Sequence, residues 1–274
     1  MSDIQTLLPL IAFLLVIGGF AGVLAGLLGV GGGIVLVPAF FYMFSALGYG
    51  SDQLMQICLA TSLATIIVTS LRSVQAHHAK GAVEWDILKG WAPGIIAGAL
   101  IGVVVASGLK SQVLQLIFGI FGLLIGVYLG LGRADWRLAE AMPKGARQAM
   151  ISPVLGFMSV LMGIGGGSFG VPFMTLHGRP IHNAVATAAG FGVLIAVPSV
   201  LAFLLVPIAP EARPPFTIGA VNLPAFALVI AMTLLTTPYG ARLAHAMDPK
   251  PLRRVFAVFL TLVALNMLRK ALGM

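Results

Sequence analysis

Two glycine triplets stand in matching apolar surroundings, at 31–33 and 165–167, and each is followed by a proline, Pro38 or Pro172. At an offset of 134 the first triplet falls on the second. Three consecutive glycines weaken a helix and leave backbone polar groups that lipid cannot satisfy. Such a break survives at membrane depth only where it packs in protein or lines a cavity, and a repeated pair indicates a solute site. The alternative is close packing of small residues between helices.

The chemistry that such breaks favour is anion binding by backbone. Each triplet precedes a short apolar segment, so free amide groups and the positive end of a helix dipole would face the break. We therefore predict that the backbone of Gly31, Gly32 and Gly33, and of Gly165, Gly166 and Gly167, contacts the solute. Helix carboxyl ends could instead offer carbonyl oxygens to a cation, which is the less favoured option.

Neutral side chains close to the triplets could add hydrogen bonds to an oxyanion. Thr61 and Thr187 occupy corresponding positions at an offset of 126, and Ser62, Ser168 and Asn183 lie near them in the sequence. We predict these five as substrate-binding residues. The competing interpretation is that Ser and Thr hydroxyls bond to carbonyls of their own helix.

Acidic and catalytic groups are absent from the apolar segments, and basic residues lie only at the ends of these segments or between them. All eight acids lie at termini or between these segments, and no paired acids, nucleophile with a base, or metal-binding spacing occurs. The sequence therefore predicts no enzyme, no catalytic residue, no metal and no cofactor. Arg72, His78 and His182 lie at segment ends, and we predict them as vestibule or gating residues, with ordinary interfacial polar residues as the alternative.

The elements that must position these residues are membrane helices. The chain is 59% hydrophobic and 9% charged, which is typical of an integral membrane protein, so its net charge of +8 does not indicate nucleic acid. Eight long apolar segments predict helices, and two shorter ones follow the triplets at 34–46 and 168–176. The long segments are 8–28, 54–71, 91–108, 112–131, 148–163, 183–206, 223–241 and 252–268.

The two halves of the chain resemble each other beyond the triplets. Gly81-Ala82-Val83 falls on Gly219-Ala220-Val221 at an offset of 138. The same offset brings Gly102 onto Gly240. We predict one all-α membrane domain made of a first repeat (1–131), a cytoplasmic linker (132–147) and a second repeat (148–274).

The distribution of basic residues favours inverted repeats. If each triplet turns the chain back, each repeat is a glycine-broken hairpin followed by three transmembrane helices, and 12 of the 16 Lys and Arg residues lie on one side. Simple crossings give at best 10 on one side, so the positive-inside rule favours the hairpins. Length agrees, because residues 8–46 as one straight helix would run nearly 60 Å at about 1.5 Å per residue.

These motifs together resemble the TauE/SafE sulfite exporter family, also called the 4-toluene sulfonate uptake permease family. Gly29–Pro38, Ala60–Ser62 and His77–Glu84 fit its pattern of a glycine triplet with a downstream proline, A-T-S, and H-x-x-x-G-x-V-D/E. The second half departs from that pattern, since Ala188 replaces the serine and no residue answers to His77, so unequal contributions of the two halves are expected.

The resemblance implies a multi-pass carrier in a bacterial inner membrane for a small anion such as sulfite, sulfoacetate or another sulfonate. We predict an exporter that works by alternating access, with the lipid bilayer and the anion as its partners and a homodimer as a further option. An anion-selective channel, and a proton-coupled uptake permease for organosulfonates or carboxylates, remain alternatives.

Overall fold

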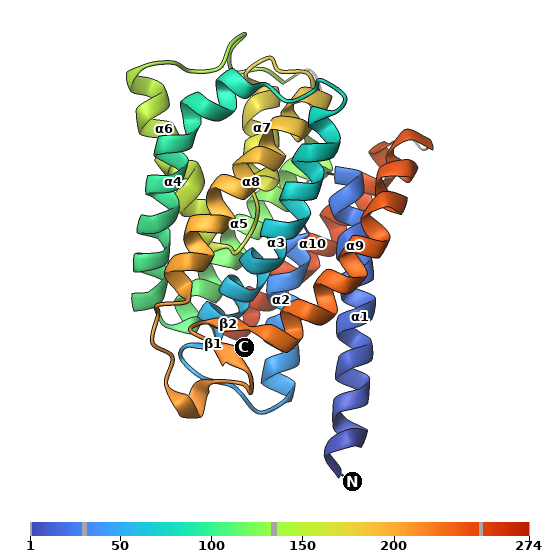
Figure 1. Cartoon of the computed structure of the whole chain (residues 1–274), viewed down its shortest axis with the longest axis vertical. Coiled ribbons are helices and arrows are strands. Elements are labelled where there is room, and N and C mark those ends of the chain that lie inside the picture. Colours follow the sequence, from blue (N-terminus) through green and yellow to red (C-terminus); the bar gives the residue numbers. More distant parts are fainter. Residues whose placement is uncertain (1, 29–31, 133–135, 247–248, 274) are drawn as a thin grey trace.

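The computed structural model describes residues 2–28, 32–132, 136–246 and 249–273. In this part of the chain, ten α-helices form an elongated bundle (Figure 1). They are α1 (Ser2–Leu28), α2 (Gly33–Ala46), α3 (Leu54–His78), α4 (Trp85–Gly108), α5 (Ser111–Leu131), α6 (Ala146–Leu161), α7 (Gly167–Leu176), α8 (Ile181–Phe203), α9 (Leu223–Ala246) and α10 (Pro249–Ala271). A short 3-10 helix, η1 (Pro210–Ala212), and a hairpin of two-residue strands, β1 (Thr217–Ile218) and β2 (Val221–Asn222), lie between α8 and α9.

Each apolar segment that the sequence indicates corresponds to one helix, so the all-α membrane architecture is confirmed. Six helices of the described chain are long and apolar enough to cross a membrane, fewer than the eight long segments expected. Helix α6 differs because it has only 16 residues. Helix α10 differs because basic residues lie near both of its ends, Lys250, Arg253 and Arg254 at one and Arg269 and Lys270 at the other.

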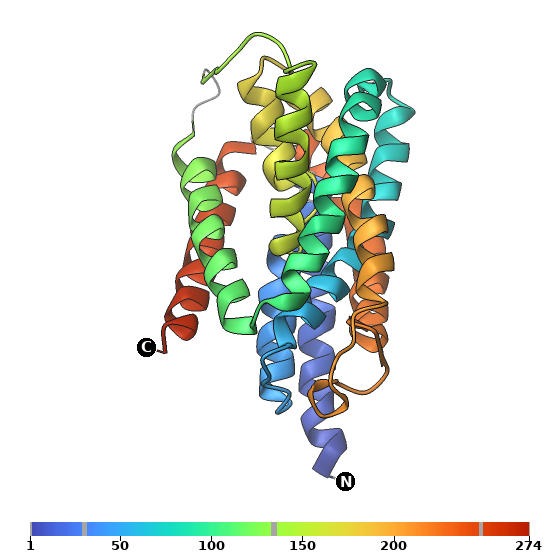
Figure 2. The same ribbon diagram turned by 90° about the vertical axis from the view of Figure 1, so that its left-hand side faces the viewer.

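Each glycine-rich segment lies between the two helices of a hairpin, the first between α1 and α2 and the second between α6 and α7. Helix α1 rises from the end of the molecule that holds the amino terminus, and α2 returns toward the same end (Figures 1 and 2). Helices α6 and α7 lie at the opposite end. Neither α2, with 14 residues, nor α7, with 10, reaches the ~20 residues that a helix needs to cross the hydrocarbon.

Helices of one half pack against helices of the other. Helix α1 packs along α9, α6 packs along α4, and α5 packs along α10. Glycines allow these close approaches, because a Cβ on Gly22 would lie 2.8 Å from the Cα of Thr233, and one on Gly156 would collide with the carbonyl oxygen of Ile95. Small residues at such contacts bring backbones together, which favours van der Waals packing between helices in a membrane.

The core of the bundle is the pair α3 and α8. These helices pack against each other, and each also receives a short helix, α2 on α3 and α7 on α8. Of the apolar stretch that could cross a membrane, 83% is buried in α3 and 28% in α1. Helix α3 therefore lies inside the protein, while α1 presents most of its surface outward. The short helices are thus held between the long central helices and the rest of the bundle.

Candidate functional site

The two helix breaks meet in the buried interior of the bundle. Gly32 precedes α2 with φ 73°, a left-handed conformation that L side chains rarely adopt. A Cβ on Gly33 would lie 2.7 Å from the carbonyl oxygen of Gly163 and 3.1 Å from the Cα of Ile164. The start of α2 therefore contacts the segment that leads into α7. Gly31 lies outside the described residues.

The second triplet packs against α8. A Cβ on Gly166 would lie 2.6 Å from the carbonyl oxygen of Ala188 and 2.7 Å from the amide nitrogen of Gly192. Gly165 and Gly167 are also buried, and α7 begins at Gly167. Unlike Gly32, Gly166 has right-handed helical backbone angles, φ −59° and ψ −20°. The two breaks thus correspond in sequence but differ in conformation.

Thr61 and Thr187 make matching hydrogen bonds across the two halves. The Asn222 amide donates to the Thr61 hydroxyl oxygen at 3.0 Å, and the Glu84 amide donates to the Thr187 hydroxyl oxygen at 2.9 Å. Both threonines are fully buried. Thr61 thus accepts from the backbone amide just before α9, 161 residues away, and Thr187 from the backbone amide just before α4, 103 residues away. Whether they also contact a substrate stays a prediction.

The other neutral candidates have separate environments. The Ser62 hydroxyl donates to the carbonyl oxygen of Gly163 at 2.7 Å, which joins α3 to the second break. The Asn183 amide donates to the carbonyl oxygen of Ala82 at 3.2 Å. The Ser168 hydroxyl, in the first turn of α7, is buried without a hydrogen-bond partner in the described structure. Ser168 is therefore the candidate whose bonding capacity is unused.

The predicted vestibule residues are exposed. Arg72, His78 and His182 all lie at the surface, and the indole of Trp85 donates to Nδ1 of His78 at 3.1 Å. They belong to the ends of α3 and α8 that lie near the linker (Figure 1). This is the end of the bundle at which α6 and α7 lie.

An ion pair that the sequence did not indicate lies at the same end. The Arg179 guanidinium donates to one carboxylate oxygen of Glu84 at 2.7 and 3.1 Å, while the other oxygen, Oε2, is buried without a partner in the described structure. Glu84 precedes α4 and Arg179 precedes α8, so the pair ties the two halves together. Within the described residues, no group of three or more His, Cys, Asp or Glu side chains could hold a metal.

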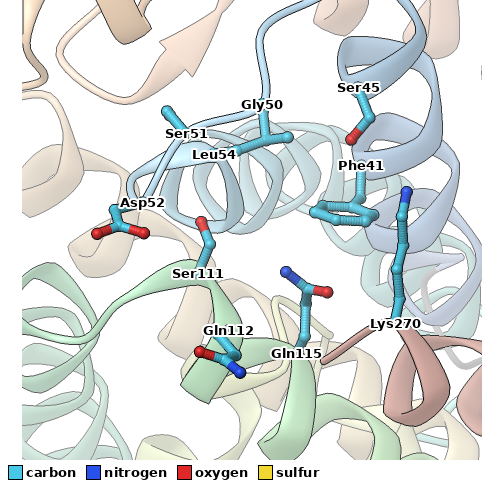
Figure 3. Close-up of a pocket in the computed structure, with 10 residues that line it drawn as sticks. All are labelled: Phe41, Ser45, Gly50, Ser51, Asp52, Leu54, Ser111, Gln112, Gln115 and Lys270. Atoms are coloured by element: carbon cyan, nitrogen blue, oxygen red, sulfur yellow. The ribbon is translucent and has the colours of Figure 1, made fainter. Parts of the chain in front are cut away.

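A cavity lies at the other end of the molecule, away from the breaks. Its volume is about 560 Å³. Figure 3 shows the side chains that line it. It is lined by the carboxyl end of α2, the turn before α3, the first turns of α5 and the last turn of α10: Phe41, Ser45, Gly50, Ser51, Asp52, Leu54, Ser111, Gln112, Gln115 and Lys270. Sequence reasoning missed it, although Gln115 is conspicuous as a polar residue in the apolar run 113–131.

Comparison with known proteins identifies the relatives of this chain. The family described as "Sulfite exporter TauE/SafE" matches residues 14–267. A "Probable membrane transporter protein" of Haemophilus influenzae is 30% identical over 93% of this chain and 97% of its own length. A relative of the same description from Methanocaldococcus jannaschii is 26% identical over 95% and 96%, and one from Bacillus subtilis is 33% identical over 64% and 71%. No solved structure was found to match the chain.

Proposed function

The chain belongs to the sulfite exporter TauE/SafE family, and from this membership we propose that it is a secondary transporter that carries sulfur-containing anions out of a bacterial cell. The family and its named relatives are membrane transporters rather than enzymes, and the chain is a multi-pass membrane protein. The exported anion would be sulfite or an organosulfonate, and the membrane would be the bacterial inner membrane.

The observation that carries the proposal is the buried meeting of the two helix breaks. Gly33 lies against Gly163, and both belong to segments where a short helix turns back beside a longer one. Broken helices near mid-depth are the usual place of a transporter's solute site, because their backbone groups can face a solute. Free amides at a helix start favour an anion.

Two inverted repeats, 1–131 and 148–274, are part of the proposal. The pairing of α1 with α9 matches that of α6 with α4, as exchange of equivalent helices requires. The hydrogen bonds of Thr61 and Thr187 are related by the same exchange of halves, because their partners Asn222 and Glu84 are equivalent at the offset of 138. The hairpins α1–α2 and α6–α7 also enter from opposite ends (Figure 1). A rotation about an axis in the membrane plane would account for all three.

Orientation follows from charge. The turn after α3, the linker and the turn before α8 lie at one end of the bundle (Figure 1), and the sequence places 12 of 16 Lys and Arg residues in segments assigned to that side. By the positive-inside rule this end would face the cytoplasm, which makes residues 132–147 a cytoplasmic linker. The amino terminus, the turn between α4 and α5, and the cavity would then face outward.

Transport would require the breaks to open. In this structure the triplets are packed, because Gly166 touches the backbone of α8 and Gly33 touches that of Gly163. Alternating access would separate these contacts from one side at a time. The Glu84–Arg179 ion pair would be one contact broken on the cytoplasmic side, next to the predicted vestibule of Arg72, His78 and His182.

The export direction follows from the membrane potential. A resting membrane is negative inside, and one elementary charge is worth about 2.3 kcal/mol per 100 mV. Exit of an anion is therefore downhill without a coupled ion. The described spanning helices carry Asp and Glu only at their ends, as with Asp86 in the first turn of α4. A coupled uptake permease would need another group, such as a histidine or the substrate itself, to carry the proton.

Counterflow in proteoliposomes tests the function. Vesicles loaded with unlabelled sulfite, sulfoacetate, benzenesulfonate, thiosulfate or sulfate receive a trace of labelled sulfite or sulfonate outside. A carrier gives a transient, saturable accumulation of label for its substrates, and protein-free vesicles are the control. A channel gives equilibration without accumulation, and a protein with no flux for any of these anions is not the proposed transporter.

A further inference from the structure

The cavity at the amino-terminal end of the bundle has the dimensions of a site for an organic ligand. Its volume of about 560 Å³ falls within the ~300–1,000 Å³ typical of small-molecule sites. It lies near the far end of α2, since Phe41 and Ser45 stand eight and twelve residues after Gly33, or about 12 and 18 Å along the helix at ~1.5 Å per residue. It is therefore separate from the helix breaks.

The buried wall of the cavity offers an unused polar group. Gln115 is 7% exposed, no hydrogen bond of its side chain occurs within the described structure, and its amide points into the cavity (Figure 3). The neighbouring Ser111 is 5% exposed, and its hydroxyl oxygen accepts from the amide of Met55 at 2.9 Å. The Ser111 hydroxyl proton thus stays available to the cavity. Buried polar groups normally have partners, so Gln115 calls for a ligand or water.

Two charged side chains line the cavity, and the positive one, Lys270, is available to a ligand. The Lys270 ammonium stands 4.8 Å from the centre of the Phe41 ring and 5.1 Å from that of Tyr42, and it pairs with no carboxylate of the described residues. Asp52 also lines the cavity, but Lys110 pairs with it at 3.3 Å. The Asp52 carboxylate lies on the opposite side of the cavity from Lys270 (Figure 3).

We propose that this cavity is a second anion site, which binds an organic oxyanion with an apolar group attached. The oxyanion would accept hydrogen bonds from Gln115 and Ser111 and face Lys270, while the apolar group would contact Phe41 and Leu54. The proposal rests on the proposed function, because the ligand is identified as the transported sulfonate, bound at the outward-facing end of the transporter. A four-atom anion such as sulfite would leave most of the volume to water, so the site favours organosulfonates over sulfite.

Cysteine labelling tests binding at this site without measuring transport. Ser45→Cys places a thiol in the cavity with little change of volume, and the natural Cys58 is fully buried, so the unmodified chain gives the background. The purified protein reacts with N-ethylmaleimide in the presence of benzenesulfonate, of the neutral methyl phenyl sulfone, or of phosphatidylglycerol. Glu211→Cys, exposed on η1 and outside the cavity, controls for quenching of the reagent.

The expected result is that benzenesulfonate slows labelling of Ser45→Cys several-fold, saturably, while the neutral sulfone does not. Adding Gln115→Leu or Lys270→Met should raise the benzenesulfonate concentration needed for protection about tenfold, which corresponds to losing one hydrogen bond to a charged group. Lys80→Met removes the same charge from the turn after α3, at the opposite end of the bundle, and should leave protection unchanged. Cys58 that stays unlabelled in each background shows that the variants are folded, because unfolding would expose this buried thiol.

Three outcomes separate this inference from the proposed function. If benzenesulfonate is transported but never protects Ser45→Cys, the cavity inference is wrong and the transporter stands. If it protects but no sulfur anion is transported, the cavity is an anion site, but its ligand is not a transport substrate and the proposed function is wrong. Protection by phosphatidylglycerol alone would overturn the substrate assignment and make the cavity a lipid site.

Discussion

Replacing Thr187 by valine removes the oxygen that accepts the Glu84 amide at 2.9 Å and changes the side-chain volume little. The site is buried, so the amide would be left without an acceptor, at a cost of about 1–3 kcal/mol. At roughly 2–4 °C per kcal/mol for a chain somewhat smaller than this one, the midpoint of thermal unfolding should fall by about 2–12 °C. Thr61→Val should do the same through the Asn222 amide.

The assay is the loss of monodisperse protein in detergent as a function of temperature. Thr175→Val is the matched control, because the Thr175 hydroxyl bonds to carbonyls of its own helix, and its removal leaves no amide without an acceptor. We expect a much smaller shift for this control. Equal midpoints for Thr187→Val and the unmodified chain would refute the structural role. An unshifted midpoint with a large loss of substrate affinity would instead support direct contact of the threonine with the anion.

Two further predictions concern the second break. Gly166→Val should reduce both the yield of folded protein and transport, because its side chain would collide with the carbonyl of Ala188. Gly108→Ala, with open space around it, is the control. A normal yield of Gly166→Val in size-exclusion chromatography would contradict the packing. Ser62→Ala removes the hydroxyl that donates to Gly163 and should cost about 0.5–1.5 kcal/mol of stability in the same thermal assay, whereas a shift as large as that of Thr187→Val would show that more than one hydrogen bond is lost.

The helices could be predicted from the sequence because each coincides with a continuous run of mainly apolar residues. Runs of apolar residues indicate α3, α5 and α9, and the glycines mark where α1 gives way to α2. The two strands between α8 and α9 were missed, since two-residue strands carry no periodicity to read. Helix α10 was predicted from its apolar segment 252–268, although its basic ends make the whole helix less apolar than its neighbours.

The candidate site could be predicted only in part, because its contacts join distant segments. The triplets were found from their repetition, and the structure places Gly33 beside Gly163. No sequence pattern indicates that the Thr61 hydroxyl accepts a hydrogen bond from an amide 161 residues away. The cavity combines side chains from four segments, so Lys270 and Gln115 become neighbours only after the chain has folded.

Efflux from vesicles with a clamped potential tests the central claim, net export of a sulfur anion, most directly. Proteoliposomes loaded with the best counterflow substrate are set to inside-negative, zero or inside-positive potential with potassium and valinomycin, without a pH gradient. We expect efflux to be fastest at inside-negative potential, where 100 mV shifts the equilibrium of a monovalent anion about fifty-fold. Efflux that is the same at all three potentials and rises only when a pH gradient is added would contradict uncoupled export.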